Sequence, residues 1–160
     1  MDATTAVKEA RSLLETLTPL KTDCGRLCEG ACCQGDEGTG MLLFPGEDAL
    51  YDACDFARIV PADFTLGGEQ AKLFVCDGHC PRDKRPLACR IFPLFLAFLK
   101  SGKTKVRMDT RAACVCPLFD SGTAGLDQEF VAAVREAYDV LLESEACAAY
   151  LRDLHKACSL

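Results

Sequence analysis

Cysteine is the residue type that most constrains this chain, because it occurs 12 times in 160 residues. A first group of four lies in the segment CGRLCEGACC: Cys24, Cys28, Cys32 and Cys33. A second group lies in CDGHCPRDKRPLACR: Cys76, Cys80 and Cys89. A third lies in CVCP: Cys114 and Cys116. Thiols gathered in this way indicate either a disulfide framework or metal ligation.

Metal ligation is the better of these two interpretations. The N-terminal segment MDATTAVKEARSLLETL is charged and lacks the apolar centre of a signal peptide, so we expect a cytoplasmic protein. Thiols stay reduced there, and 160 residues can bury a core without cross-links. Cys32 and Cys33 are also adjacent, which makes a bond between them difficult.

The spacing of the first group argues against one straight helix around one ion. Cys24, Cys28 and Cys32 recur every four residues, and on a helix their Cα atoms would span about 12 Å. Sulfur ligands of one zinc ion lie only about 3.7 Å apart. Gly25 and Gly30 disfavour a continuous helix, so we expect a segment that wraps around a metal centre.

Charge and hydropathy exclude two classes of partner. The net charge is −6, which argues against binding to nucleic acid. The longest apolar run, at 91–99, is too short to span a bilayer and contains a proline. The expected partner is therefore a metal ion or cluster, and the sequence identifies no protein partner.

The periodicity of apolar residues predicts a small, irregular α+β domain covering residues 1–160. Helices are expected at 4–20 and about 126–156, with a short one within 45–56. Short antiparallel strands are expected at 41–44 and 71–75, and in a hairpin that pairs 95–99 with 104–108. In this prediction the helices pack on the strands, and the cysteine-rich loops gather around a metal site at one end.

The isolated cysteines and both histidines have ordinary interpretations. Cys54, Cys147 and Cys158 are expected to be small buried hydrophobic residues. Within the third group, Cys116 is the better ligand candidate because a proline follows it. His79 is interpreted as an exposed turn residue and His155 as a solvated residue near a helix C-terminus.

The first two groups together resemble the YkgJ-like cysteine-cluster family, whose members carry a CxxCxxCC motif and are described as zinc- or iron-chelating domains. Cys32 and Cys33 match the doublet, Cys76 and Cys80 match the cysteines that follow, and Arg85, Pro86, Cys89 and Arg90 match an RPxxCR element. The resemblance covers residues 24–93. The first group departs from the pattern, with three residues rather than two between its cysteines.

The resemblance implies metal binding, while the spacing bears on which metal. Structural zinc sites commonly use C-x2-C pairs, and this chain has none. Iron–sulfur clusters tolerate irregular spacing more freely, so the sequence leans towards an iron–sulfur cluster over Zn²⁺. The predicted metal ligands come from this set: Cys24, Cys28, Cys32, Cys33, Cys76, Cys80, Cys89 and Cys116. Arg85, Pro86 and Arg90 are expected to shape their surroundings.

Three functions are compatible with such a centre: metal binding without catalysis, electron transfer through an iron–sulfur cluster, and an enzyme in which the cluster is a scaffold. Flagellin lysine methylases resemble the chain over the cysteine cluster and carry an iron–sulfur centre, but they are much longer. No nucleotide fingerprint, Ser-His-Asp set or paired-carboxylate signature accompanies the cysteines. We therefore expect a metal-binding protein that is not an enzyme.

Overall fold

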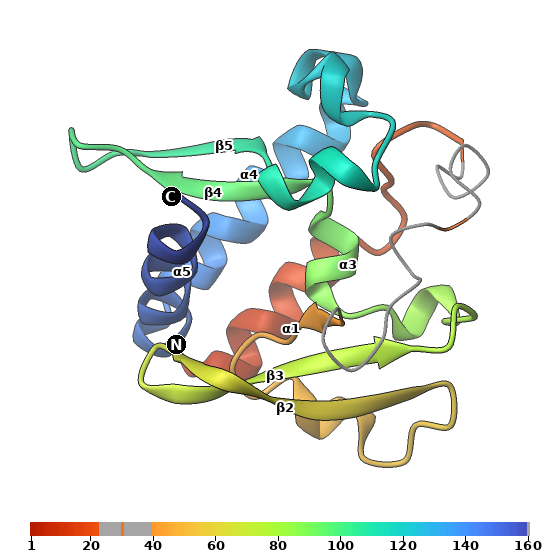
Figure 1. The fold of residues 1–160 in the computed structure, drawn as a ribbon. Helices are drawn as coiled ribbons and strands as arrows, with labels where there is room; N and C mark the ends of the chain where they lie inside the picture. Colours follow the sequence, from red (N-terminus) through yellow and green to blue (C-terminus); the bar gives the residue numbers. More distant parts are fainter. Residues whose placement is uncertain (23–29, 31–39, 160) are drawn as a thin grey trace.

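Two antiparallel sheets lie on opposite sides of the molecule, with helices between them, in a computed structural model that describes residues 1–22, 30 and 40–159 (Figure 1). One sheet has the strand order β1-β3-β2, from β1 (Met41–Leu42), β2 (Ala57–Leu66) and β3 (Glu69–Cys76). The other pairs β4 (Leu94–Phe98) with β5 (Thr104–Met108). The helices are α1 (Ala3–Leu13), α3 (Leu87–Ile91), α4 (Gln128–Leu142) and α5 (Glu145–Cys158). The predicted mixed α+β class is confirmed.

Helix packing builds the main hydrophobic core. α1 lies along α4, and α5 contacts both β2 and β4, so that it joins the two sheets. Phe130, Val134 and Leu141 of α4 are fully buried. Residues at this spacing lie on one face of a helix, and the predicted apolar stripe of α4 therefore faces the core.

The hairpin formed by β4 and β5 follows the prediction closely. Leu94 pairs with Met108, Leu96 with Val106, and Phe98 with Thr104. The predicted second strand, 104–108, has the right limits, and the first begins one residue earlier than expected. Alternating apolar and polar residues in β5 leave Val106 buried and its neighbours exposed, which is the pattern of a strand with one face on the core.

The prediction of one helix over 126–156 was wrong, because α4 ends at Leu142 and α5 begins at Glu145. Ser144 lies between them with an extended backbone (φ −98°, ψ 120°) and its carbonyl accepts from the Ala148 N–H at 2.8 Å. Serine before a glutamate is typical of a helix start. The break lets α5 turn back across both sheets.

Two other expectations also need correction. The first helix ends at Leu13 rather than at residue 20. Pro19 disfavours helical backbone at the residue before it, and Leu17 and Leu20 pack on the core from outside the helix. The second correction is β2, which was not predicted. Pro61 interrupts its pattern, and the pairing with β3 shifts register between Pro61 and Thr65; an edge strand tolerates both.

A two-residue turn, Gly67-Gly68, joins β2 to β3 beneath α5. Both glycines have positive φ, 63° and 84°, as a tight hairpin turn of this kind requires. A Cβ on Gly67 would lie 2.9 Å from the Tyr150 backbone nitrogen, whereas a Cβ on Gly68 would meet nothing within 4 Å. The Gly67 N–H donates to Asp153 Oδ2 at 2.9 Å. The turn therefore docks directly on α5.

Replacing each of these glycines separates backbone strain from crowding. Both Gly67→Ala and Gly68→Ala incur the penalty of positive φ, about 1–2 kcal/mol each. We expect Gly67→Ala to lower the free energy of unfolding by a further 1–3 kcal/mol or so, because its methyl group would press on α5. Urea denaturation of both variants measures the difference. Equal losses would show that the turn does not press against α5 as described.

Candidate metal centre

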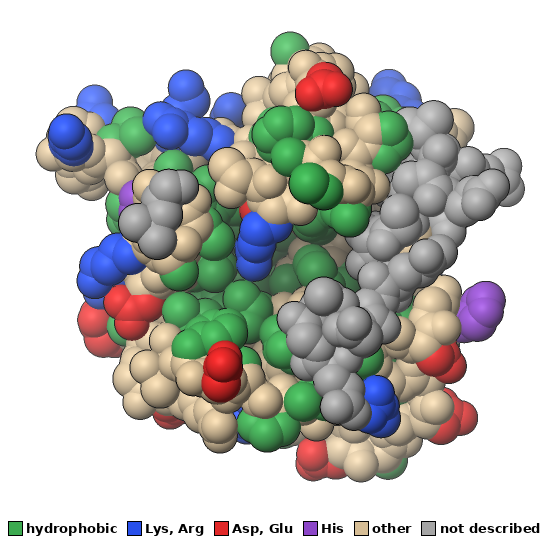
Figure 2. Space-filling view, viewed as in Figure 1, with side chains coloured by type: hydrophobic (Ala, Val, Ile, Leu, Met, Phe, Trp, Pro, Cys, Tyr) green, Lys and Arg blue, Asp and Glu red, His purple; other side chains and the backbone are tan. Residues whose placement is uncertain are grey.

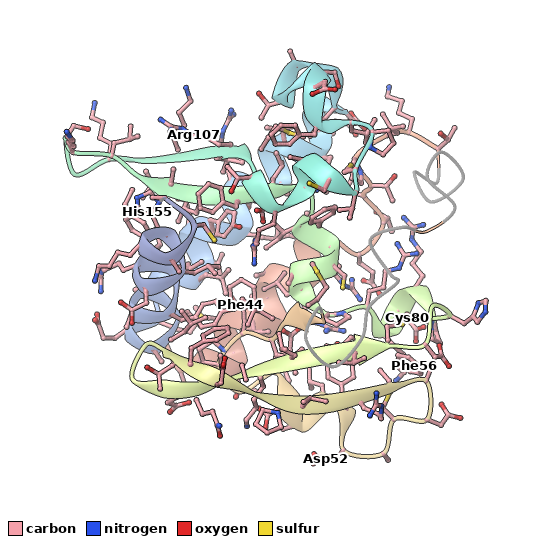
Figure 3. All side chains as sticks on the ribbon, in the orientation of Figure 1. Phe44, Asp52, Phe56, Cys80, Arg107 and His155 are labelled. Atoms are coloured by element: carbon pink, nitrogen blue, oxygen red, sulfur yellow. The ribbon has the colours of Figure 1, made fainter. Side chains whose placement is uncertain are left out.

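The structure locates four of the eight predicted ligands. Cys76 is the last residue of β3, Cys80 lies in the loop that follows, Cys89 lies in α3, and Cys116 follows the 3₁₀ turn η4 (Thr110–Cys114). All four are partly buried. Figure 3 shows Cys80 at the edge of the molecule, above Phe56. The other four predicted ligands lie outside the described residues: Cys24, Cys28, Cys32 and Cys33.

The described cysteines do not form a metal site by themselves. Within residues 1–22, 30 and 40–159, no three His, Cys, Asp or Glu side chains come together closely enough to hold an ion. Cys76 Sγ accepts from the Gly78 N–H at 3.4 Å, and Cys80 Sγ lies 3.4 Å from the Pro81 carbonyl. Cys116 packs against the main core. A complete site would need ligands from the first group.

The remaining cysteines differ in how deeply they are buried. Cys147 is fully buried, and burial raises the pKa of its thiol. Cys54 is partly buried beside the small cluster of Leu43, Tyr51 and Phe74. Cys158 is partly buried at the end of α5, while Cys114 is exposed. The expectation of a buried hydrophobic residue is confirmed for Cys147, whereas Cys54 and Cys158 are less buried than expected.

Neither histidine belongs to a ligand cluster in the described structure. His79 is exposed, and its backbone N–H donates to Asp77 Oδ1 at 3.0 Å, which confirms the turn. His155 is only partly exposed, because its ring stacks on Phe95 with centroids 6.1 Å apart and meets Phe98 edge-on. The interpretation of His155 as a solvated residue was therefore wrong in part.

A buried carboxylate, that of Glu47, holds the segment that carries Cys80 and Cys89. The Glu47 side chain has no exposed surface. Oε1 accepts from the Leu87 N–H at 2.6 Å and from Arg11 Nη1 at 3.1 Å, and Oε2 accepts from the Phe44 N–H at 3.1 Å. Burial raises the pKa of the Glu47 carboxyl, whereas the hydrogen bonds from these three donors lower it, and the effect of burial is the larger. The carboxylate thus links α1, the segment that follows β1 and the first residue of α3.

Side chains also bind the backbone between the two cysteines. Four successive carbonyls in the segment 82–85 accept hydrogen bonds from outside it. Arg90 donates to three of them, with Nε to Arg85 O at 2.9 Å and Nη2 to Asp83 O at 3.0 Å and Arg82 O at 3.4 Å. Tyr51 donates from its hydroxyl to Lys84 O at 2.9 Å. Arg90 is 9% exposed, so this charged group acts inside the fold.

Arg11 completes this network, which we call the carboxylate network: Arg11, Glu47, Tyr51 and Arg90. Arg11 Nη1 donates to the Tyr51 hydroxyl at 2.7 Å, and its backbone carbonyl accepts from Arg90 Nη1 at 3.3 Å. Burial raises the pKa of Tyr51, with the Glu47 carboxylate and the Cys80 thiol adding to the effect.

The residues around Cys89 differ in burial. Arg90 and Pro86 are buried, and Pro86 precedes the first residue of α3. Arg82 and Lys84 are exposed, as in an ordinary solvated loop.

Sequence reasoning missed Arg11, Glu47 and Tyr51, because each has the polar character of a surface residue. The one signal in the sequence was that Glu47 closely follows the apolar run MLLF, after the turn residues Pro45 and Gly46.

Comparisons with models of protein families, with curated proteins and with solved structures found no match to the chain. In the described part of the chain, no helix has the length and apolar character needed to cross a membrane.

Removing the charge of Glu47 should destabilise the fold. In Glu47→Gln the amide nitrogen must face one of three N–H donors, and Arg11 loses its buried counter-ion. We expect the free energy of unfolding to fall by about 3–5 kcal/mol, the usual effect of breaking a buried pair. Chemical denaturation gives this value directly.

The neighbouring residue supplies a matched control. Asp48 pairs with Lys72, and both side chains are substantially exposed, at 32% and 46%. Asp48→Asn should therefore change the free energy of unfolding by no more than about 1 kcal/mol. Similar losses in the two variants would contradict the role assigned to Glu47.

Proposed function

We propose that this protein binds an iron–sulfur cluster or a zinc ion through thiolates of its first and second cysteine groups, without catalysis of its own. The single observation that carries the proposal is the carboxylate network. It immobilises the backbone between Cys80 and Cys89 by hydrogen bonds to four consecutive carbonyls. Metal ligands need support of this kind, because outer groups fix their orientation.

The segment that follows the first cysteine group, from Gly40 onward, is anchored near Cys76. Met41 pairs with Phe74 in the sheet. A Cβ on Gly40 would lie 2.8 Å from the Phe74 carbonyl oxygen and 2.9 Å from Val75 Cγ2, so Gly40 lies directly against β3. Six residues separate Cys33 from Gly40, and the seven steps between these two residues span at most about 25 Å. This reach supports a centre shared between the two groups.

The donor chemistry supports a soft or borderline metal. Thiolates select zinc, iron–sulfur clusters and Cu(I) over hard cations. The irregular spacing of the cysteines favours an iron–sulfur cluster. The resemblance of residues 24–93 to zinc- or iron-chelating cysteine-cluster domains supports metal binding of either kind. Cys54, Cys76, Cys114, Cys147 and Cys158 carry free thiols, which suits a reducing compartment such as the cytoplasm.

Cys76, Cys80 and Cys89 would hold the centre together with cysteines of the first group, and Cys116 is the weaker candidate. A bound cluster would supply one-electron chemistry, and a bound zinc ion would supply folding energy alone. The residues of this chain would hold the ligand cysteines in position. Arg90 and Tyr51 keep the loop that carries Cys80 in place, and Glu47 holds the start of the helix that carries Cys89.

Protein purified without oxygen distinguishes the two metals. An iron–sulfur centre should give iron and acid-labile sulfide in the preparation, with broad visible absorption that bleaches on reduction with dithionite. A zinc centre should give a colourless protein with about one or two zinc ions per chain. A preparation that contains neither metal at stoichiometric levels would refute the proposal.

Substitution of single cysteines tests which thiols are ligands. Cys89→Ala should lower metal content and thermal stability together, because the binding energy of a site absent from the unfolded chain is folding energy. Cys147→Ala should leave metal content unchanged, although loss of a buried sulfur lowers stability by about 1 kcal/mol. Elemental analysis and thermal denaturation of both variants provide the two readouts. Equal metal content in both would rule out Cys89 as a ligand.

A further inference from the structure

A second feature of the molecule is the outer edge of β5. The sheet that β5 forms with β4 has only these two strands in the described part of the chain. α4 contacts β5 and α5 contacts β4. In Figure 1 the hairpin extends beyond α5, with β5 as its outermost strand. A strand in this position presents a row of unpaired backbone groups.

The hydrogen bonds of the hairpin show which backbone groups of β5 point outward. The Leu99 N–H donates to the Lys103 carbonyl at 2.8 Å, and the Asp109 N–H donates to the Pro93 carbonyl at 2.7 Å. In an antiparallel pair, such hydrogen-bonded positions alternate with positions whose N–H and C=O groups face away from the partner strand. The outward positions of β5 are therefore Thr104, Val106 and Met108. Within the described residues, no hydrogen bond reaches their backbone groups.

Basic side chains gather on the same hairpin, as Figure 2 shows. Residues 94–108 contain four basic residues and no acidic one, in a chain whose net charge is −6. All four are exposed, and none forms an ion pair in the described part of the chain: Lys100, Lys103, Lys105 and Arg107. Lys105 and Arg107 alternate with the buried Val106, so their side chains stand on the solvent face of β5.

Charge decides what can occupy this edge. A second copy of β5 would bring like charges together, and cationic side chains on an edge strand oppose such self-pairing. Nucleic acid fits less well, because the net charge of −6 repels a long polyanion and the rings of Phe95 and Phe98 pack on His155 rather than offering surfaces to bases. A strand with acidic side chains at alternate positions matches both the backbone groups and the charge.

We propose that β5 binds an extended acidic segment of a partner protein, which adds to the sheet as a third strand. The backbone of this segment forms hydrogen bonds with Thr104, Val106 and Met108. Its acidic side chains lie beside Lys105 and Arg107, as cross-strand neighbours on one face of a sheet do. The proposal does not depend on metal binding.

A capped, fluorescein-labelled peptide of alternating glutamate and threonine is a suitable probe, because one face of its strand is wholly acidic. We expect saturable binding to the protein as purified, measured by fluorescence anisotropy. The affinity should be at least tenfold higher than that of the same peptide with glutamine in place of glutamate. Lack of saturable binding at about 1 mM peptide, or equal affinity for an oligothymidylate of the same length, would overturn the proposal.

Amide hydrogen exchange tests whether the peptide adds as a strand. At saturation, exchange should slow about tenfold or more at Thr104, Val106 and Met108, because their N–H groups gain partners. Exchange at Lys105 and Arg107 should not change, because their N–H groups already face β4. Binding without this alternation along β5 would refute strand addition.

A charge reversal on β5 tests the part played by the basic side chains. Lys105→Glu should weaken binding of the glutamate peptide about fivefold, because it replaces an attractive neighbour with a repulsive one. Lys8→Glu is the matched control, because Lys8 is exposed on α1 and its replacement changes the net charge equally. It should bind the peptide normally, and thermal denaturation of both variants checks that they fold. Equal losses in the two variants would show attraction to the whole molecule and refute the site on β5.

Discussion

The buried Glu47 carboxylate is the interaction on which the arrangement of the molecule depends. A carboxylate without exposed surface is tolerated only where hydrogen bonds replace its water. Its donors come from Arg11 of α1, the Phe44 N–H after β1 and the Leu87 N–H of α3. These three segments must therefore meet at one point. Their meeting positions the loop and the short helix that carry Cys80 and Cys89.

The helices and sheets around this point serve two different regions of the molecule. On one side of α3, side chains hold backbone carbonyls so that cysteines are presented from a rigid loop. On the other side, α5 joins the two sheets through the Gly67 turn and through β4, and residues of both sheets and of α5 share the main hydrophobic core. One short helix thus separates a region rich in sulfur from a region rich in hydrophobic groups.

Local patterns predicted some of these elements and missed others for identifiable reasons. The hairpin of β4 and β5 was predictable because its strands alternate in hydropathy and a short turn joins them. β2 was missed because it is an edge strand with mostly exposed residues and a proline. The continuous helix over 126–156 was predicted because apolar residues recur on both sides of Ser144, and only the extended backbone at that residue separates α4 from α5.

By itself, the sequence determined which chemical groups the chain offers: many thiols in three groups, an acidic chain, and an RPxxCR element that contains Cys89. Spacing and composition are enough for that, because ligand preference depends on the kind of atom that each residue carries. The tertiary structure alone decided which polar side chains are buried. Arg11, Glu47, Tyr51 and Tyr150 have no local signature, because burial depends on contacts between segments that are distant in the sequence.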